Sequence, residues 1–269
     1  MHRSLRLTAM LLAIAVVGGA AGSADRAKGY LDPGEFDVTH VLEPAPRPGD
    51  PRYDADRKIF RATRALAGSP RWVLATADVE TGAPAMLRDF SCAAGVALTP
   101  DNAPKLVALV QRAGADTGAQ TAHAKDVYQR LRPFQIDRGP ICQPQSELFD
   151  QKVGRISYDY PSGHTTWGWT WALILAGLAP DRAQAILERG RVYGDSRFIC
   201  GAHNESAVEG GFLSASATMA VVATKPAYQS DRAAAKAELD ALRAHGPAPS
   251  DCATGMVLVH GNAKLPYAP

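Results

Sequence analysis

The sequence predicts an all-α protein whose mature part forms one domain. Apolar residues recur at helical spacing in several segments, and Ser or Thr followed by Pro marks two helix starts. No segment shows the alternation of Val or Ile with polar residues that a strand requires. Residues 164–178 are apolar nearly all round, which is typical of a helix at the centre of a core. We therefore expect a helical bundle built around this segment, with no internal repeat and no linker.

The first 24 residues are typical of a secretory signal peptide. Arg3 and Arg6 precede an apolar run over 7–17, and small residues at 22–24 form a cleavage site. The run is well short of the ~20 apolar residues that span a membrane, so we expect cleavage near Ala24 rather than anchoring. The sequence therefore predicts a secreted, periplasmic protein.

The mature chain is close to neutral. Removing residues 1–24 lowers the number of Lys and Arg from 29 to 27, which equals the 27 Asp and Glu. A nucleic-acid-binding surface would need a basic stripe, and the chain has none. Beyond residue 24 no run of ~20 apolar residues is present, so the mature chain is expected to have no membrane span.

The first half of the mature chain reads as an arm followed by helices. Residues 25–50 are rich in Pro, Gly and Asp and are expected to form an extended N-terminal arm, and 51–269 the helical domain. Helices are expected at 54–67, at 70–80 behind a Ser69 cap, and from Thr99 onward. Residues 122–132 are expected to be helical up to Pro133.

The second half contains a long loop and the apolar helix. Residues 134–160 show little periodicity, and long loops in compact domains are often functional. Helices are expected at 164–178, 181–193, 203–223 and 231–245, followed by a loop-like tail over 246–269. The helix at 164–178 is too short for a membrane span.

Four cysteines indicate disulfides in an oxidising compartment. They are Cys92, Cys142, Cys200 and Cys252, for which three pairings are open, and buried free thiols are the alternative. No two of them have the spacing of zinc ligands, so we expect no metal site.

Three segments are rich in groups that bind an oxyanion. Lys125 and Arg132 are seven residues apart, two turns of one helix, so both should point the same way. Arg197 offers a planar fork for phosphate oxygens, and His203 is a candidate nucleophile. Taken singly, basic residues on one helical face are more often part of a solvated surface, and a lone histidine is more often a core residue.

The third segment lies where the long loop meets the apolar helix. Ser162, Gly163 and His164 stand at the helix start, where unpaired N–H groups and the helix dipole favour an anion. Gly163 allows close approach of the backbone, Ser162 adds a hydroxyl, and His164 could protonate a leaving oxygen. A plain helix cap with an incidental histidine is the alternative.

The three motifs occur together and in a fixed order: Lys-x6-Arg-Pro, Pro-Ser-Gly-His and Ser-Arg-x5-His. This is the signature of the type-2 phosphatidic acid phosphatase superfamily. Within it, the chain resembles the class A bacterial non-specific acid phosphatases, from about Tyr30 to Lys225. The motifs Ser-Cys-Ala-Ala-Gly-Val at 91–96, Pro-Lys-Leu at 104–106 and the segment 193–201 share this likeness.

The resemblance implies a metal-free, cofactor-free acid phosphatase that hydrolyses small phosphate monoesters. It implies that Lys125, Arg132 and Arg197 clamp the phosphate, and that Ser162 and Gly163 donate further hydrogen bonds. By the same resemblance, His203 attacks phosphorus and His164 acts as the general acid and base. The product is inorganic phosphate, and transfer to alcohols is a reasonable side activity of a phosphohistidine.

One position departs from the family pattern. The family motif continues His-x3-Asp, and that Asp accepts a hydrogen bond from the far nitrogen of the nucleophilic histidine. This chain has Ala207 there, which cannot accept one. Glu205, Ser206, Glu209 or a backbone carbonyl are the candidates for a substitute acceptor, although neither glutamate is well placed on an ideal helix.

Three other functions remain as alternatives. A phosphate-binding pseudoenzyme would explain Ala207. A vanadate-dependent haloperoxidase would share the anion site, but such chains are usually much longer. A lipid phosphatase of the membrane branch is disfavoured because the mature chain lacks a long apolar span. The sequence leaves a homo-oligomer, the preferred ester and the pH optimum open.

Overall fold

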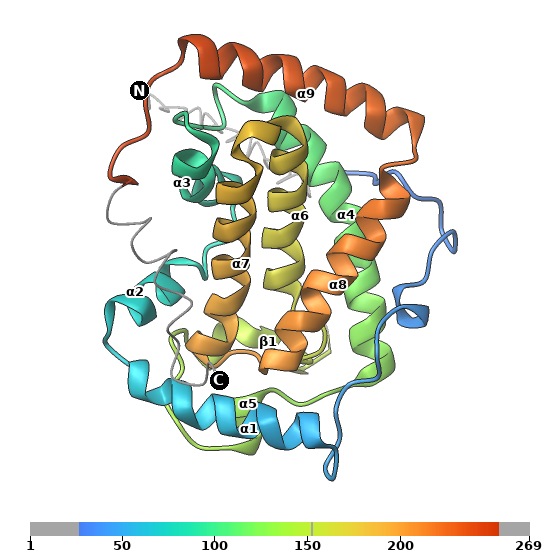
Figure 1. Cartoon of the computed structure of the whole chain (residues 1–269). Helices are drawn as coiled ribbons and strands as arrows, with labels where there is room; N and C mark the ends of the chain where they lie inside the picture. Colours follow the sequence, from blue (N-terminus) through green and yellow to red (C-terminus); the bar gives the residue numbers. More distant parts are fainter. Residues whose placement is uncertain (1–26, 152, 253–269) are drawn as a thin grey trace, which may run out of the picture.

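The computed structural model describes residues 27–151 and 153–252, and over these ranges the protein is essentially all-α, as predicted (Figure 1). The predicted signal peptide and most of the predicted C-terminal tail lie outside the described residues. The helices are α1 (Pro51–Thr63), α2 (Pro70–Ala77), α3 (Ala83–Ala94), α4 (Pro104–Tyr128), α5 (Pro133–Ile136), α6 (Gly163–Leu178), α7 (Ala183–Cys200), α8 (Glu205–Val222) and α9 (Pro226–His245). Short 3-10 turns lie at Val38–His40, Arg64–Leu66, Gln145–Leu148 and Pro180–Arg182.

The strands form one small antiparallel pair. β1 (Phe149–Asp150) pairs with β2 (Arg155–Ile156), with Phe149 opposite Ile156. This hairpin lies inside the segment 134–160, which was expected to be a loop and also contains all of α5 except its first residue. The segment therefore keeps mostly irregular backbone between short elements.

Helices α6 and α7 lie side by side at the centre of the bundle, with α4 and α8 beside them and α9 across one end (Figure 1). Their close approach depends on glycine: a Cβ added at Gly168 of α6 would lie 2.2 Å from the ring of Tyr193 on α7. A side chain at this position would force the two helices apart. The apolar helix expected at 164–178 is thus confirmed, and it is the centre of the fold.

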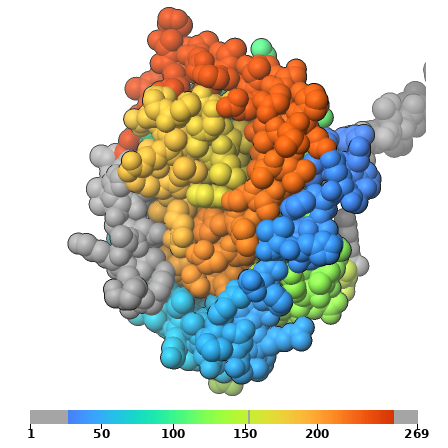
Figure 2. All heavy atoms as spheres, turned by 45° about the vertical axis from the view of Figure 1, so that its right-hand side comes forward, coloured from blue at the N-terminus to red at the C-terminus, as the bar shows by residue number. Residues whose placement is uncertain are grey.

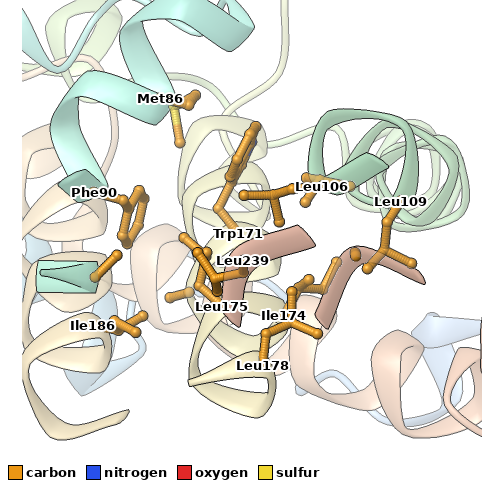
Figure 3. Packing of buried hydrophobic residues seen from close by; sticks show 14 of the residues in the cluster. Met86, Phe90, Leu106, Leu109, Trp171, Ile174, Leu175, Leu178, Ile186 and Leu239 are labelled. Atoms are coloured by element: carbon orange, nitrogen blue, oxygen red, sulfur yellow. The ribbon is translucent and has the colours of Figure 1, made fainter. Parts of the chain in front are cut away.

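The main core surrounds the C-terminal half of α6. Figure 3 shows Trp171, Leu175 and Leu178 of α6 meeting Phe90 of α3 and Leu239 of α9. Trp171 and Leu175 are completely buried, and each such side chain contributes roughly 1.5–3 kcal/mol of hydrophobic free energy. This packing leaves the opposite end of α6 for polar residues.

Residues 27–50 run as a mostly irregular segment over the surface beside α8 (Figure 2, dark blue). The backbone N–H of Tyr30 donates to Asp116 at 2.7 Å, and that of Val38 donates to Gln120 at 2.9 Å. Both partners lie on α4, so this segment is attached to the helix that carries Lys125.

The prediction that Lys125 and Arg132 share one helical face is wrong. Helix α4 ends at Tyr128, and Gln129 adopts a left-handed conformation with φ of 49°. Arg132 is extended, as expected for a residue before proline, and Pro133 begins α5 instead of ending a helix. The two cations reach the site from different elements.

Other boundaries also differ from the prediction. Helix α3 was not expected, and α4 begins at Pro104 rather than near Thr99. Helix α7 extends through Arg197 to Cys200, and α8 begins only at Glu205, so His203 lies in the turn between them. Gly201, with φ of 80°, ends α7 in the left-handed conformation that glycine adopts without strain.

The four cysteines form two disulfides, Cys92–Cys252 and Cys142–Cys200. This confirms the expectation of disulfides, resolves the open pairing and excludes the alternative of free thiols. The Cys142–Cys200 bridge joins the irregular segment after α5 to the last residue of α7.

Within residues 27–151 and 153–252, no single helix is long and apolar enough to cross a membrane. Helices α8 and α9 together satisfy the same length and composition test only as a pair bent by 102°.

Candidate active site

The predicted site residues meet at one end of the bundle, where α4 and α7 end and α6 and α8 begin (Figure 1). Lys125 lies in the last turn of α4, and Arg197 in the last turn of α7. Ser162, Gly163 and His164 form the start of α6. The structure thus brings together seven side chains or backbone groups that are spread over 79 positions of sequence, from 125 to 203.

Arg132 is 2% exposed and holds the turn that contains His203. Its guanidinium donates to the backbone carbonyls of Ser157 and Ala202, each at 2.7 Å, and to the Ser157 hydroxyl at 2.8 Å. One guanidinium nitrogen, Nη1, also lies 3.0 Å from Nε2 of His203. Burial lowers the pKa of Arg132 to about 10, so it remains a cation at acidic and neutral pH.

Arg197 is fully buried, and its charge is only partly satisfied. Its Nη2 donates to the side-chain oxygen of Gln143, but Nε and Nη1 have no hydrogen-bond partner within the described parts of the chain. Burial lowers the pKa of Arg197 to about 10. Unpaired buried N–H groups on a cation are costly, so this side chain is suited to receive the oxygens of an anion.

Lys125 is partly buried beside the start of α6. Its Nζ lies 4.0 Å from the point that a Cβ on Gly163 would occupy. Removal from water, with a further contribution from Arg132, lowers the pKa of Lys125 to about 7. A cation with so low a pKa gains from any anion that binds next to it.

Two hollows open beside Lys125 and the start of α6. One of about 240 Å³ is lined by Lys125, Gly163 and the small residues of α4 at 114 and 118. The other, of about 390 Å³, is lined by Thr81, Gly163, His164 and Trp167. Gly163 and Trp167 border both, so the start of α6 is reached from solvent on two sides.

The start of α6 is capped from within. The Ser162 hydroxyl accepts hydrogen bonds from the backbone N–H of Thr165 at 3.3 Å and from its hydroxyl at 3.0 Å. The backbone N–H of Ser162 donates to the carbonyl of Ala207 at 2.8 Å. What remains for an anion is the hydroxyl hydrogen of Ser162 and the N–H groups of Gly163 and His164, which stand in the first helical turn.

The partners of His203 fix its tautomer. Nε2 faces the guanidinium of Arg132, which can only donate, so Nε2 carries a lone pair. Nδ1 lies 2.8 Å from the backbone carbonyl of Asp159 and 3.0 Å from its carboxylate, both acceptors, so Nδ1 carries the proton. Burial, followed by Arg132 and Lys125, holds the pKa of His203 well below its usual range. The ring is therefore neutral, with the lone pair of Nε2 directed at Arg132.

His164 is positioned by a backbone carbonyl. Its Nε2 lies 3.1 Å from the oxygen of Val79, which can only accept, so Nε2 carries a proton. Nδ1 is then the nitrogen that can exchange a proton with a ligand. Burial, followed by Arg197 and His203, holds the pKa of His164 well below its usual range when no anion is bound.

Asp159 is a site residue that the sequence analysis missed. Its carboxylate is fully buried and accepts from Nδ1 of His203 and from the backbone and side-chain N–H groups of Asn204 at 3.2 and 2.8 Å. It lies only two residues before Pro161 of the second motif, a nearness to the site that was visible in the sequence.

The substitutes expected for the missing Asp have other partners. Ser206 contacts Asp56 and Arg130, and Glu209 pairs with Arg191 at 2.9 Å. Burial raises the pKa of Glu205, at the start of α8, to about 7. Of the four acceptors that the sequence analysis named, only a backbone carbonyl is found at Nδ1 of His203, and it is that of Asp159. The carboxylate of Asp159, which the sequence analysis did not name, lies there too.

The described residues contain no group of three or more His, Cys, Asp or Glu side chains arranged to hold a metal ion.

Comparison with known proteins identifies the family. The pattern of the PAP2 superfamily matches residues 106–231, which include every predicted site residue. An acid phosphatase of Zymomonas mobilis is 40% identical over 210 residues, covering 78% of both chains. This chain belongs to the PAP2 superfamily.

Other relatives carry the same kind of name. A non-specific acid phosphatase of Salmonella typhimurium is 34% identical over 220 residues, covering 81% of this chain and 86% of the relative. Another, of Providencia stuartii, is 32% identical over 209 residues, covering 77% and 83%. These relatives confirm the family resemblance that the three motifs indicated.

Proposed function

We propose that this protein is a secreted acid phosphatase that hydrolyses small phosphate monoesters through a phosphohistidine on His203, without a metal ion. The observation that carries the proposal is the position of Nε2 of His203. It bears a lone pair and lies 3.0 Å from Arg132, in a site where Arg197 has two buried N–H-bearing nitrogens without partners. A phosphate bound to these donors would present its phosphorus to the histidine.

The phosphate would be held by charge and by backbone groups. Lys125, Arg132 and Arg197 neutralise its oxygens, and the first N–H groups of α6 donate to it. Phosphoryl transfer requires mostly positioning and charge neutralisation, which these groups supply from the protein alone.

In the first step, the Nε2 lone pair of His203 forms a bond to phosphorus while the bond from phosphorus to the ester oxygen breaks. The ester oxygen keeps the bonding electrons and takes a proton from Nδ1 of His164, so that an alcohol leaves. The proton on Nδ1 of His203 stays in place, and the phosphoryl group remains on Nε2.

In the second step, a water molecule replaces the alcohol. His164 accepts a proton from this water at Nδ1 as its oxygen attacks phosphorus. The bond from phosphorus to Nε2 breaks, and its electrons return to His203. Inorganic phosphate leaves, and both histidines regain their starting protonation. An alcohol in place of water would give transphosphorylation by the same path.

The low pKa of His164 in the empty site favours acidic operation. A neutral His164 must gain its proton with the substrate, and a phosphate monoester carries one below its second pKa of about 6. The monoanion can transfer this proton to His164 once it is bound among three cations. The productive complex therefore forms most readily at acidic pH.

The test is release of p-nitrophenol from p-nitrophenyl phosphate by the purified mature protein in EDTA, from about pH 4 to pH 8. We expect turnover in EDTA and its loss in H203A, with H203A still binding inorganic phosphate in calorimetry. Acid-labile, base-stable radiolabel on the protein after quenching would identify the phosphohistidine. Turnover that requires added metal, or that survives H203A, would refute the mechanism.

We also propose that residues 1–24 direct the chain to the periplasm and are then removed, leaving the arm and the helical domain. Support comes from the leader pattern at 1–24 and from the two disulfides, which form in oxidising compartments. The mass of the protein recovered from a bacterial periplasmic fraction tests this: a mass that begins near Asp25 is expected, and a full-length cytoplasmic chain would contradict it.

A further inference from the structure

The nucleophilic histidine of the proposed mechanism keeps a carboxylate partner although the family position for it is occupied by Ala207. Ala207 lies in the first turn of α8 and is completely buried. It packs in a small apolar cluster that includes Tyr160 and Ala124. Its side chain cannot accept a hydrogen bond, so the carboxylate on His203 must come from elsewhere in the fold.

We propose that Asp159 is the positioning residue for His203, and that it replaces the carboxylate that the family carries four residues after this histidine. The inference rests on the proposed function, in which Nε2 of His203 attacks phosphorus. Asp159 is not itself a catalytic residue, because it acts on the reaction only through the histidine ring.

The geometry supports this role. The carboxylate oxygen Oδ1 lies 3.0 Å from Nδ1 of His203, and both side chains are at most 1% exposed. Asn204 holds the same carboxylate through its backbone N–H at 3.2 Å and its side-chain amide at 2.8 Å. Arg130 lies 3.8 Å from the other oxygen. With these donors around it, the carboxylate has one orientation, and that orientation faces the histidine.

The backbone of Asp159 is also fixed. Its N–H donates to the carbonyl of Arg130 at 2.9 Å, and its own carbonyl accepts from Nδ1 of His203 at 2.8 Å. Nδ1 is thus placed between two acceptors of one residue. The carbonyl can hold the tautomer alone and favours the charged ring through its dipole. The carboxylate adds a full negative charge beside the positive charge that the ring gains when Nε2 is phosphorylated.

The chain offers a matched control in Asp56. This carboxylate is 1% exposed and bonds to the same arginine, with Oδ2 at 2.6 Å from Nη2 of Arg130. It also accepts from the N–H of Ser206 at 2.9 Å and from its hydroxyl at 2.6 Å. Among the described residues, its hydrogen bonds and ion pair go to Arg130 and Ser206 and not to His203. Asp56→Asn therefore perturbs the same buried network without touching the histidine.

The activity experiment compares D159N with D56N under the conditions that support wild-type turnover. We expect D159N to lose about 10²-fold in kcat with KM little changed, because the phosphate clamps stay in place. This is less than the ~10⁴-fold loss known for the analogous serine-protease aspartate, because the backbone carbonyl remains. D56N is expected to lose thermal stability and to retain its kcat. Phosphoenzyme formation after rapid quenching should slow in D159N by the same factor as kcat.

A double variant tests whether a carboxylate at position 207 can replace the one at position 159. D159A should lose at least as much kcat as D159N. D159A/A207D should recover about tenfold of this loss, a typical coupling between residues of one hydrogen-bond network. In the parent background, A207D should not raise activity, because it would bury a second carboxylate close to the first.

A third measurement does not depend on turnover. In nuclear magnetic resonance of the wild-type protein, the proton on Nδ1 of His203 should be strongly shifted downfield, as expected for a bond to a buried carboxylate. Its signal should move upfield in D159N and stay in D56N. This readout separates the inference from the proposed function, because it applies even to a wild-type protein that does not hydrolyse esters.

The results that overturn the inference are equally defined. An Nδ1 proton without a downfield shift in the wild type would show that no carboxylate holds it. Wild-type kcat in D159N would show that the backbone carbonyl is sufficient. Equal losses of kcat in D159N and D56N would assign both residues a structural role only.

Discussion

Two buried arginines on α7 have opposite surroundings. Arg189 is 6% exposed and donates to the carboxylate of Asp78 at 2.6 Å, with Asp89 3.5 Å away. Burial acts to lower its pKa, but these two carboxylates raise it above the ordinary value. Arg197, two turns further along, lies against the neutral Gln143, and burial lowers its pKa.

The contrast distinguishes a structural charge from a functional one. The Arg189 pair is complete within the protein, so it holds α2 and α3 against α7. Arg197 is also buried but, within the described residues, has no carboxylate paired with it. Its unpaired charge lowers the stability of the free protein, and a bound anion would remove this loss. Two arginines of the same helix thus have different roles: Arg189 stabilises the fold, and Arg197 is placed to bind an anion.

The largest expected effect comes from removing each arginine in turn. R197M should lower kcat/KM by at least about 10³-fold, on the scale of an arginine that stabilises phosphoryl transfer. Its free energy of unfolding should stay level or rise, because an unpaired buried charge has gone. R189M should lose about 3–5 kcal/mol of stability, because Asp78 is left buried without it. Kinetics and urea unfolding measure both.

This pair of variants can also break the comparison. If R197M were as unstable as R189M, Arg197 would be a structural residue. If R189M lost activity while its fold remained intact, Arg189 would also have a role in the reaction, and the contrast between the two arginines would be wrong.

The second prediction concerns pH. Because burial, followed by Arg197 and His203, holds the pKa of His164 low, the proton for the leaving group must arrive with the substrate. Above about pH 6 the ester becomes a dianion, and kcat/KM should fall about tenfold per pH unit. A pH-rate profile of the wild type checks this. A value of kcat/KM that rises between pH 6 and pH 8 would contradict it.

The third prediction extends the comparison to Lys125, whose pKa is lowered to about 7. The unfolded chain holds this proton up to about pH 10.4, so between these values the unfolded state binds more protons. In the absence of anions, the stability deficit caused by charged Lys125 is complete below about pH 7 and shrinks as the pH rises. The difference in unfolding free energy between K125M and wild type should shrink in the same window.

Bound phosphate should raise the pKa of Lys125 and so restore the proton that this side chain lacks above about pH 7. Binding of inorganic phosphate near pH 8 should be accompanied by proton uptake at Lys125, visible as a dependence of the calorimetric heat on the buffer. K125M should bind more weakly and take up less. Equal uptake by both proteins would assign the proton to another group.

The smallest expected effect concerns Gln143, the neutral partner of Arg197. Q143A removes one hydrogen bond that orients the guanidinium but leaves the charge, so KM should rise about threefold with kcat nearly unchanged. Steady-state kinetics with p-nitrophenyl phosphate measure this. A loss as large as that in R197M would mean that the orientation of Arg197 outweighs its charge.

Most of the fold could be predicted because the strongest signals are local. The apolar helix at 164–178 and the Ser69 cap with Pro70 appear as expected. The error at Lys125 and Arg132 arose because Gln129 carries no strong sign of a helix end, although Pro133 already disfavoured a helical Arg132. Helix α3 was missed although its apolar residues follow a helical period, because no capping side chain marks its start at Gly82.

The candidate site could be predicted where its members stand in ordered motifs, which the structure brings to one end of the bundle. The nearness of Asp159 to the second motif was visible, but its role was not, because the contact with His203 spans 44 positions and no local pattern specifies it. The expectation of a partner at i+4 assumed that His203 lies on a helix. It lies in a turn, where the spacing rule for helices does not apply.

The double acceptor on Nδ1 of His203 has an evolutionary consequence. The backbone carbonyl at position 159 is present whatever side chain the gene encodes there. A lineage that lost the carboxylate at position 207 before gaining one at 159 would still have kept an acceptor on the ring. The carboxylate could therefore change position by single substitutions, with each ancestor retaining an oriented histidine. Signatures that count residues from the histidine would overlook the descendants of such a path.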